Sequence, residues 1–330
     1  MLRVALLLLA STASAAVQPG AVDAAARYSA SRGGASLLVI ENRKTVREEY
    51  PDGGGGGAAR KIFSGTKAFW NLAALAAAED GLLSLDERVA ETIPAWRDDP
   101  RKARVTIRQL LDFSCGLEPA FRLHNDNPGD RDAIAIRASI VAEPGSAFVY
   151  GPAPLQVFHA VLKAKLRGDA PRRYLERRVL RRLGLGPQRY LPDRAGNPLL
   201  AAGWELTAPQ WAKIGELVLR NGAPAISAGS LEQCWRGSPP NRAYALGWWN
   251  NRAAPGGREF DFERALTPRW SAQDWNNATI CRSAPSDLVA CIGSRYQRLY
   301  VIPSLQLVVV RNGNGRSFSD AQFLRLLLGH

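Results

Sequence analysis

The sequence is poor in residues on which many enzymes depend, because only three of its 330 residues are His and only four are Cys. His159 lies in an apolar stretch typical of a helix, His124 lies in a polar segment, and His330 is the last residue. The sequence contains no G-x-S-x-G pentapeptide and no C-x-x-C pair. Neither a Ser-His-Asp triad nor a zinc site is therefore supported, and we expect no metal and no other cofactor.

Long apolar runs are also missing, since no stretch reaches the roughly 18 apolar residues that a membrane-spanning helix needs. The chain begins with Arg3, a short apolar run over residues 4–10, and the small residues Ala13-Ser14-Ala15. This order is typical of a cleavable export signal. We expect residues 1–15 to be removed, the mature protein to be periplasmic or secreted, and no stable insertion into a membrane.

Positive charge is plentiful, but it does not indicate a nucleic-acid partner. The net charge is +13, and the basic residues are spread along the chain apart from one cluster over residues 172–182. That cluster has helical spacing, which is typical of a solvated helix face, and no nucleic-acid recognition motif accompanies it. We therefore expect no binding to nucleic acid.

The four cysteines leave the disulfide pattern open. They are Cys115, Cys234, Cys281 and Cys291. Export permits disulfides, and four cysteines allow three pairings. A bond between Cys281 and Cys291 would close a short loop and is the pairing we favour, and four free buried thiols are the alternative.

Hydrophobic patterning predicts strands at both ends of the chain and helices between them. The expected strands are 36–41, 46–50, 58–63, 243–249, 288–292, 297–302 and 305–311. The expected helices are 22–31, 66–80, a helix capped by Thr106, 130–141, 152–166, 171–183, 208–221, 231–235 and 317–328, the last capped by Ser317. This order predicts an α/β lobe built from both ends, with a helical lobe inserted.

The strongest chemical signal is the S-x-x-K motif Ser64-Gly65-Thr66-Lys67 at the start of an apolar helix. Residues three apart share one helix face, so the lysine amine can reach the serine hydroxyl. Burial disfavours a charged lysine, and a neutral lysine can accept the serine proton. The helix N-terminus also offers backbone N–H groups to a developing oxyanion.

The motif belongs to six segments that lie in the order of a known family. They are IFSGTKAF (62–69), DGLLSLD (80–86), VTIRQLL with SCGL (105–117), FVYGP (148–152), YALGWW (244–249), and QRLYVIP with LVVVR (297–311). These segments resemble those of class C β-lactamases and their esterase and amidase relatives, in the serine β-lactamase and penicillin-binding-protein superfamily. The resemblance covers nearly all of the chain after residue 15.

The resemblance implies both a fold and a set of catalytic roles. The implied fold is α/β, an antiparallel sheet flanked by helices with an inserted helical lobe. We expect a single domain over 16–330, with an α/β lobe of 16–80 and 225–330 and a helical lobe of 81–224.

The implied nucleophile is Ser64, with Lys67 as general base and Tyr150 as proton relay. The implied oxyanion donors are the backbone N–H of Ser64 and one near Cys291. We also expect the charge of a neighbouring lysine to lower the pKa of Tyr150.

Two departures from the family pattern bear on the substrate. Pro152 stands where the family carries the Asn of Y-x-N, and residues 288–290 (LVA) stand where it carries K-T-G. The cation that would pair with a substrate carboxylate is thus missing, unless Arg295 or Arg298 replaces it. We expect a small-molecule ester or amide substrate. A β-lactam or peptidoglycan-peptide substrate, and an inactive binding protein that kept the fold, remain as alternatives.

Overall fold

The structure is a computed structural model that describes residues 17–126, 129–252, 254, 256–265 and 273–330. The predicted export signal therefore lies outside the described residues. Within them, no helix is long and apolar enough to cross a membrane.

Both ends of the chain contribute to one seven-stranded sheet, as the sequence predicted. The strand order is β2-β1-β11-β10-β9-β6-β5, and each neighbouring pair is antiparallel. The strands are β1 (Gly34–Glu41), β2 (Lys44–Glu49), β5 (Tyr244–Ala245), β6 (Trp248–Asn250), β9 (Val289–Gly293), β10 (Gln297–Ile302) and β11 (Leu307–Gly313). Two small sheets pair β3 (Arg60–Lys61) with β4 (Glu205–Leu206) and β7 (Arg258–Glu259) with β8 (Ala278–Thr279).

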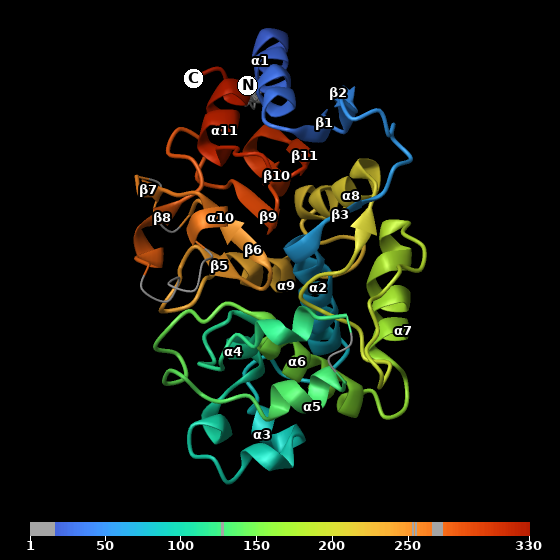
Figure 1. Ribbon diagram of the computed structural model, residues 1–330, viewed down its shortest axis with the longest axis vertical. Helices are drawn as coiled ribbons and strands as arrows, with labels where there is room; N and C mark the ends of the chain where they lie inside the picture. Colours follow the sequence, from blue (N-terminus) through green and yellow to red (C-terminus); the bar gives the residue numbers. More distant parts are fainter. Residues whose placement is uncertain (1–16, 127–128, 253, 255, 266–272) are drawn as a thin grey trace, which may run out of the picture.

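Helices cover both faces of this sheet (Figure 1). Side chains alternate between the two faces along β10, so its neighbouring residues contact different helices. Tyr300 stacks on Phe323 of α11 (Asp320–Leu328), which packs beside α1 (Pro19–Ser31). On the opposite face lies α8 (Ala208–Leu219). A Cβ on Gly215 of α8 would lie 2.6 Å from Val308 and 3.2 Å from Leu299. The glycine therefore lets α8 pack closely against the sheet.

The remaining helices are α2 (Thr66–Glu79), α3 (Val89–Thr92), α4 (Ile107–Leu111), α5 (Arg131–Ile136), α6 (Pro152–Lys165), α7 (Pro171–Leu175), α9 (Ala228–Glu232) and α10 (Phe262–Ala265). Of these, α3, α4, α5 and α6 form the lower half of the molecule, α2 runs down its middle with α7 and α9 beside it, and α10 lies next to the large sheet (Figure 1). The lobe boundary differs from the predicted one in one respect. We placed residues 81–224 in the helical lobe, but α8 belongs to the sheet because its apolar face covers β10 and β11.

Several predicted elements are shorter than expected. The strand over 58–63 is reduced to β3, because the chain turns at Phe63, whose φ is 46°. The strand over 243–249 is split into β5 and β6 by a turn at Leu246 and Gly247, which both have positive φ. Helix α11 is capped by Ser319, whose hydroxyl accepts from the Gln322 N–H, and not by Ser317. The predicted capping box of Thr106 and Gln109 is confirmed at the start of α4.

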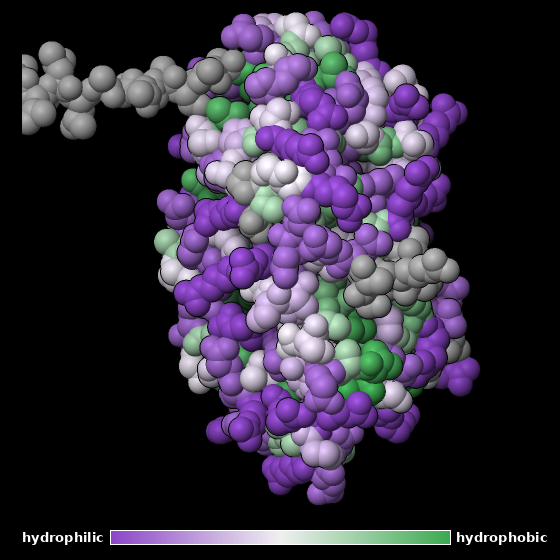
Figure 2. Space-filling view, turned by 90° about the vertical axis from the view of Figure 1, so that its left-hand side faces the viewer, coloured by the Kyte–Doolittle hydropathy of each residue, from purple (hydrophilic) through white to green (hydrophobic). Residues whose placement is uncertain are grey.

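All four cysteines are free and buried, so the pairing of Cys281 with Cys291 is wrong. Cys291 lies within β9, whereas the Cys281 thiol contacts Ser283 and the carbonyl of Ala321 in α11. The face of the molecule drawn in Figure 2 is mostly hydrophilic, with hydrophobic side chains gathered in one area of its lower half.

Candidate active site

Ser64 lies on a tight turn that delivers it to the N-terminus of α2. The turn is the 3-10 segment Phe63–Gly65, and it leads directly into Thr66. Phe63 adopts a left-handed conformation, which costs a non-glycine residue free energy and persists only when the surroundings enforce it. Ile62 before it is fully buried. The turn therefore has a fixed geometry that exposes the Ser64 hydroxyl at the end of a helix.

Lys67 lies one helical turn further along α2, and its amine is held against the serine. Its Nζ lies 2.8 Å from Ser64 Oγ and 2.7 Å from the carbonyl oxygen of Ala201, and it donates to both. Among the described residues, no carboxylate forms an ion pair with this amine. Burial lowers the pKa of Lys67 from 10.5 to about 7. At neutral pH a large share of the amine is thus uncharged and able to accept a proton.

Tyr150 completes a cluster of three polar groups. It lies just before α6, its hydroxyl forms a hydrogen bond with Ser64, and Lys67 Nζ is 4.8 Å from its ring centroid. Phe113 packs on the ring at a centroid distance of 4.8 Å. The expectation of a lowered pKa is wrong. Burial raises the pKa of Tyr150 well above its usual range and outweighs the opposing hydrogen bond with Ser64, so the phenol is neutral at physiological pH.

These three residues line one pocket of about 140 Å³. The other residues of its wall are Phe121, His124, Gly151, Pro152, Phe262, Glu263, Ile292 and Ser294. Three of them carry polar side chains that the sequence motifs did not connect with the site, His124, Glu263 and Ser294. Burial, reinforced by the charge of Lys67, lowers the pKa of His124 to about 4, so this imidazole is neutral. His124 reaches the site from a 3-10 segment, Phe121–His124, for which no sequence motif exists.

Neither arginine that could have replaced the missing cation lines the pocket. Arg298 is fully buried and its guanidinium contacts Asp320, with 2.5 Å between Nε and Oδ1. Arg295 donates to the carbonyl oxygen of Asn314 at 2.8 Å. Pro152 occupies the first turn of α6, where it offers no polar side chain. Among the described residues of the wall, Lys67 is therefore the only lysine or arginine, and Glu263 is the only carboxylate.

The edge of β9 passes directly beside the nucleophile turn. A Cβ on Gly293 would lie 2.0 Å from the carbonyl oxygen of Ile62, so only glycine permits this approach. The Leu288 carbonyl accepts a hydrogen bond from the Asn251 N–H on the β6 side. Backbone groups alternate between the two edges of a regular antiparallel strand. The N–H of Ile292 therefore faces the same edge as Leu288, whereas that of Cys291 faces β10.

The pairing of β6 with β9 runs only from Val289 to Ala290. The next N–H on this edge, that of Ile292, lies where β9 packs against the nucleophile turn. Cys291 itself is fully buried and is not part of the pocket wall.

Comparison with known proteins places this geometry in a family. A family model described as Beta-lactamase matches residues 20–229. No curated protein matches the chain. Three solved structures illustrate the structural similarity, all at low sequence identity.

A class C β-lactamase from Rhodobacter sphaeroides has a TM-score of 0.68 at 18% identity, over 95% of this chain and 99% of that one. A putative 6-aminohexanoate-dimer hydrolase from Bacillus anthracis has a TM-score of 0.69 at 17% identity, over 92% of this chain and 79% of that one. A D-stereospecific amidohydrolase from Streptomyces sp. has a TM-score of 0.65 at 16% identity, over 92% of this chain and 97% of that one.

At these identities the solved structures establish the fold, an α/β architecture with an antiparallel sheet, and the family match covers more than half of the chain. The predicted resemblance is thereby confirmed. The chain belongs to the beta-lactamase family.

Proposed function

We propose that this protein is a serine hydrolase that cleaves a small ester or amide through an acyl-enzyme on Ser64. The observation that carries the proposal is the 2.8 Å contact between Lys67 Nζ and Ser64 Oγ, made by a buried amine whose pKa is lowered to about 7. An amine in this state is a general base matched to neutral pH. Family membership supports a hydrolase, and ester and amide substrates are our inference.

In the acylation step, Ser64 Oγ attacks the substrate carbonyl carbon and Lys67 takes the hydroxyl proton. The oxyanion is held by backbone N–H groups, for which we propose Ser64 and Ile292. Ile292 takes the place of Cys291 in this role because its N–H faces the nucleophile turn and that of Cys291 faces β10. The bond to the leaving group then breaks, and its oxygen or nitrogen must receive a proton.

Tyr150 is the group that we propose for this proton transfer. Its hydroxyl contacts Ser64 and its ring lies beside Lys67, so it can pass the proton from the lysine to the leaving group. Because burial keeps the phenol neutral, it acts as both donor and acceptor and not as a phenolate base. Water then attacks the acyl-enzyme, and the same groups transfer protons in the reverse direction and release Ser64.

The pocket favours esters and linear amides over β-lactams and peptidoglycan peptides. Those two substrates carry a carboxylate, and the described wall offers no arginine or lysine other than Lys67, which acts as the base. The export signal that the sequence predicts over residues 1–15 supports our further proposal that the protein acts in the periplasm or outside the cell.

Turnover of short p-nitrophenyl esters by the wild type and by Ser64→Ala tests the proposal. We expect hydrolysis by the wild type and a loss of at least about 10³-fold in the variant. The matched control is Ser31→Ala, an exposed serine at the end of α1, which should keep wild-type turnover. Equal activity of Ser64→Ala and wild type would contradict the proposal and favour a binding protein that kept the fold.

A further inference from the structure

One acidic side chain stands in the wall of the pocket, at the side formed by α10 and the end of β9. Glu263 lies on α10 and lines the same pocket as Ser64 and Tyr150. Its charge is close enough to the reacting groups to contribute to the raised pKa of Tyr150. A carboxylate near the nucleophile of a hydrolase affects which charged substrates can bind.

The position of Glu263 is fixed by the strand next to it. Its Oε1 accepts a hydrogen bond from the Tyr296 N–H at 2.9 Å and lies 3.6 Å from a guanidinium nitrogen of Arg298. Its own N–H donates to Asp261 at 2.9 Å. Among the described residues, no hydrogen bond is made to the second oxygen, Oε2. One oxygen thus anchors the side chain and the other is left for a ligand in the pocket.

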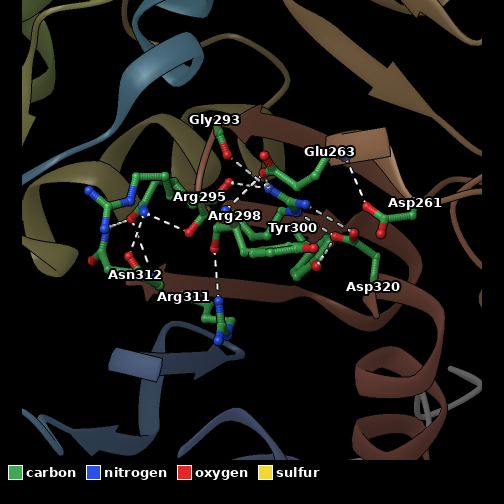
Figure 3. A network of polar contacts seen from close by, with 12 residues as sticks. Asp261, Glu263, Gly293, Arg295, Arg298, Tyr300, Arg311, Asn312 and Asp320 are labelled. Atoms are coloured by element: carbon green, nitrogen blue, oxygen red, sulfur yellow. Dashed lines mark hydrogen bonds and ion pairs between the residues drawn. The ribbon is translucent and has the colours of Figure 1, made fainter. Parts of the chain in front are cut away.

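Arg298 does not neutralise Glu263, because its charge is already balanced. Figure 3 shows the guanidinium of Arg298 between Glu263 and Asp320. Two of its nitrogens bind Asp320 at 2.5 and 3.1 Å, whereas the contact with Glu263 is longer. Tyr300 also donates to Asp320. The buried pair of Arg298 and Asp320 is therefore neutral as a unit, and Glu263 retains its negative charge.

The other charged groups near the pocket do not reverse the negative potential that Glu263 creates there. Asp261 forms an ion pair with Arg264, whose exposed side chain has its Nε 3.7 Å from Asp261 Oδ2. The imidazole of His124 is neutral, and Lys67 is partly uncharged at neutral pH. The protein as a whole carries +13 charges, but solvent and salt screen distant charges over about 8 Å. The local carboxylate therefore dominates the potential felt by a substrate inside the pocket.

We propose that Glu263 selects substrates that carry an ammonium group near the scissile ester or amide, and disfavours substrates that carry a carboxylate there. This inference rests on the proposed function and names its substrate class. An ammonium has three donors. The free Oε2 of Glu263 and the Ser294 hydroxyl are acceptors in the same wall. A carboxylate would instead face a like charge without a cation to pair with.

The test uses three p-nitrophenyl esters that share five methylenes and end in an ammonium, a methyl or a carboxylate. They are the esters of 6-aminohexanoic acid, heptanoic acid and pimelic acid. We expect kcat/KM to fall in that order, with the ammonium ester about tenfold or more above the methyl ester. Hexylamine and hexanoate, used as competitive inhibitors, compare an ammonium with a carboxylate without fixing the group to one side of the scissile bond. We expect hexylamine to bind more tightly than hexanoate.

Glu263→Gln removes the charge and keeps an oxygen that can accept from Tyr296. The ratio of kcat/KM between the ammonium and methyl esters should fall by about tenfold in this variant, and Glu263→Lys should invert the preference towards the carboxylate ester. The control Glu232→Gln alters an exposed carboxylate paired with Arg252 and should leave the ratio unchanged.

An unchanged ratio in Glu263→Gln would overturn the inference, and so would an equal loss for all three esters. Failure of the proposed function itself has a different signature. In that case a fluorophosphonate would not label Ser64, and none of the three esters would be turned over at a rate above that of Ser64→Ala.

Discussion

Lys67 and Arg298 are both buried cations, and they serve opposite purposes because their partners differ. Arg298 is fully buried with a carboxylate on two of its nitrogens. Burial lowers the pKa of Arg298, but the charge and hydrogen bonds of Asp320 contribute to a net rise. Lys67 is 2% exposed, and among the described residues its amine forms hydrogen bonds with a carbonyl and a hydroxyl but no ion pair with a carboxylate, so burial lowers its pKa to about 7. Of these two cations, the arginine balanced by a carboxylate stays charged and structural, whereas the lysine without one can lose its proton and act as a base.

The largest effect should come from removing the unbalanced cation. Lys67→Met deletes the general base and should lower kcat/KM for an ester by about 10²- to 10⁴-fold. Lys67→Arg should not rescue activity, because a guanidinium stays protonated and cannot accept the Ser64 proton. Steady-state kinetics of the two variants check this. Near-wild-type activity of Lys67→Arg would break the distinction drawn between the two cations.

The next effect in size concerns the balanced cation. Asp320→Ala leaves the Arg298 charge buried without its carboxylate, and should lower the free energy of unfolding by about 3–5 kcal/mol. Urea denaturation measures this change. The matched double variant Arg298→Met with Asp320→Leu removes both charges and should recover most of the loss. An Asp320→Ala protein as stable as the wild type would show that the pair contributes no structural stability.

Fold and site differ in how far the sequence predicted them. The apolar runs of β1, β10 and β11 and the S-x-x-K motif are local signals, so the sheet and the pair of Ser64 and Lys67 could be predicted from them. Glu263 and His124 come from short segments with no motif, and only the folded chain brings them to Ser64.

The misjudged pKa of Tyr150 has a physical cause of a different kind. The sequence shows that a lysine is near, but it does not show that Phe113 and its neighbours exclude water from the phenol. Burial then decides the direction of the shift. The wrong disulfide prediction has a similar cause, since the separation of Cys281 and Cys291 along the chain does not reveal that they occupy different parts of the core.

The smallest expected effect is on stability at the site itself. Lys67→Met loses the bond to the Ala201 carbonyl and also removes a buried amine, so at pH 7 its free energy of unfolding should stay within about 1 kcal/mol of the wild type. The wild type has a further signature. Between pH 7 and 10.5 the unfolded chain binds a proton on Lys67 that the folded chain does not, so stability should rise with pH in that window.

Denaturation curves at several pH values measure this slope. The rise in the free energy of unfolding that Lys67 causes should be absent from Lys67→Met. The free energies of unfolding of the two proteins should therefore diverge as the pH rises from 7. Parallel curves for the two proteins would contradict the lowered pKa.

The most direct test of the account is the rate at which a fluorophosphonate labels Ser64 as the pH is varied from 5 to 9, with the adduct located by mass spectrometry. We expect the adduct on Ser64, a labelling rate that rises about tenfold per pH unit below 7 and levels off above it, and no such rise in Lys67→Met. A rate independent of pH, or an adduct on a different residue, would contradict the claim that an unpaired buried lysine activates Ser64.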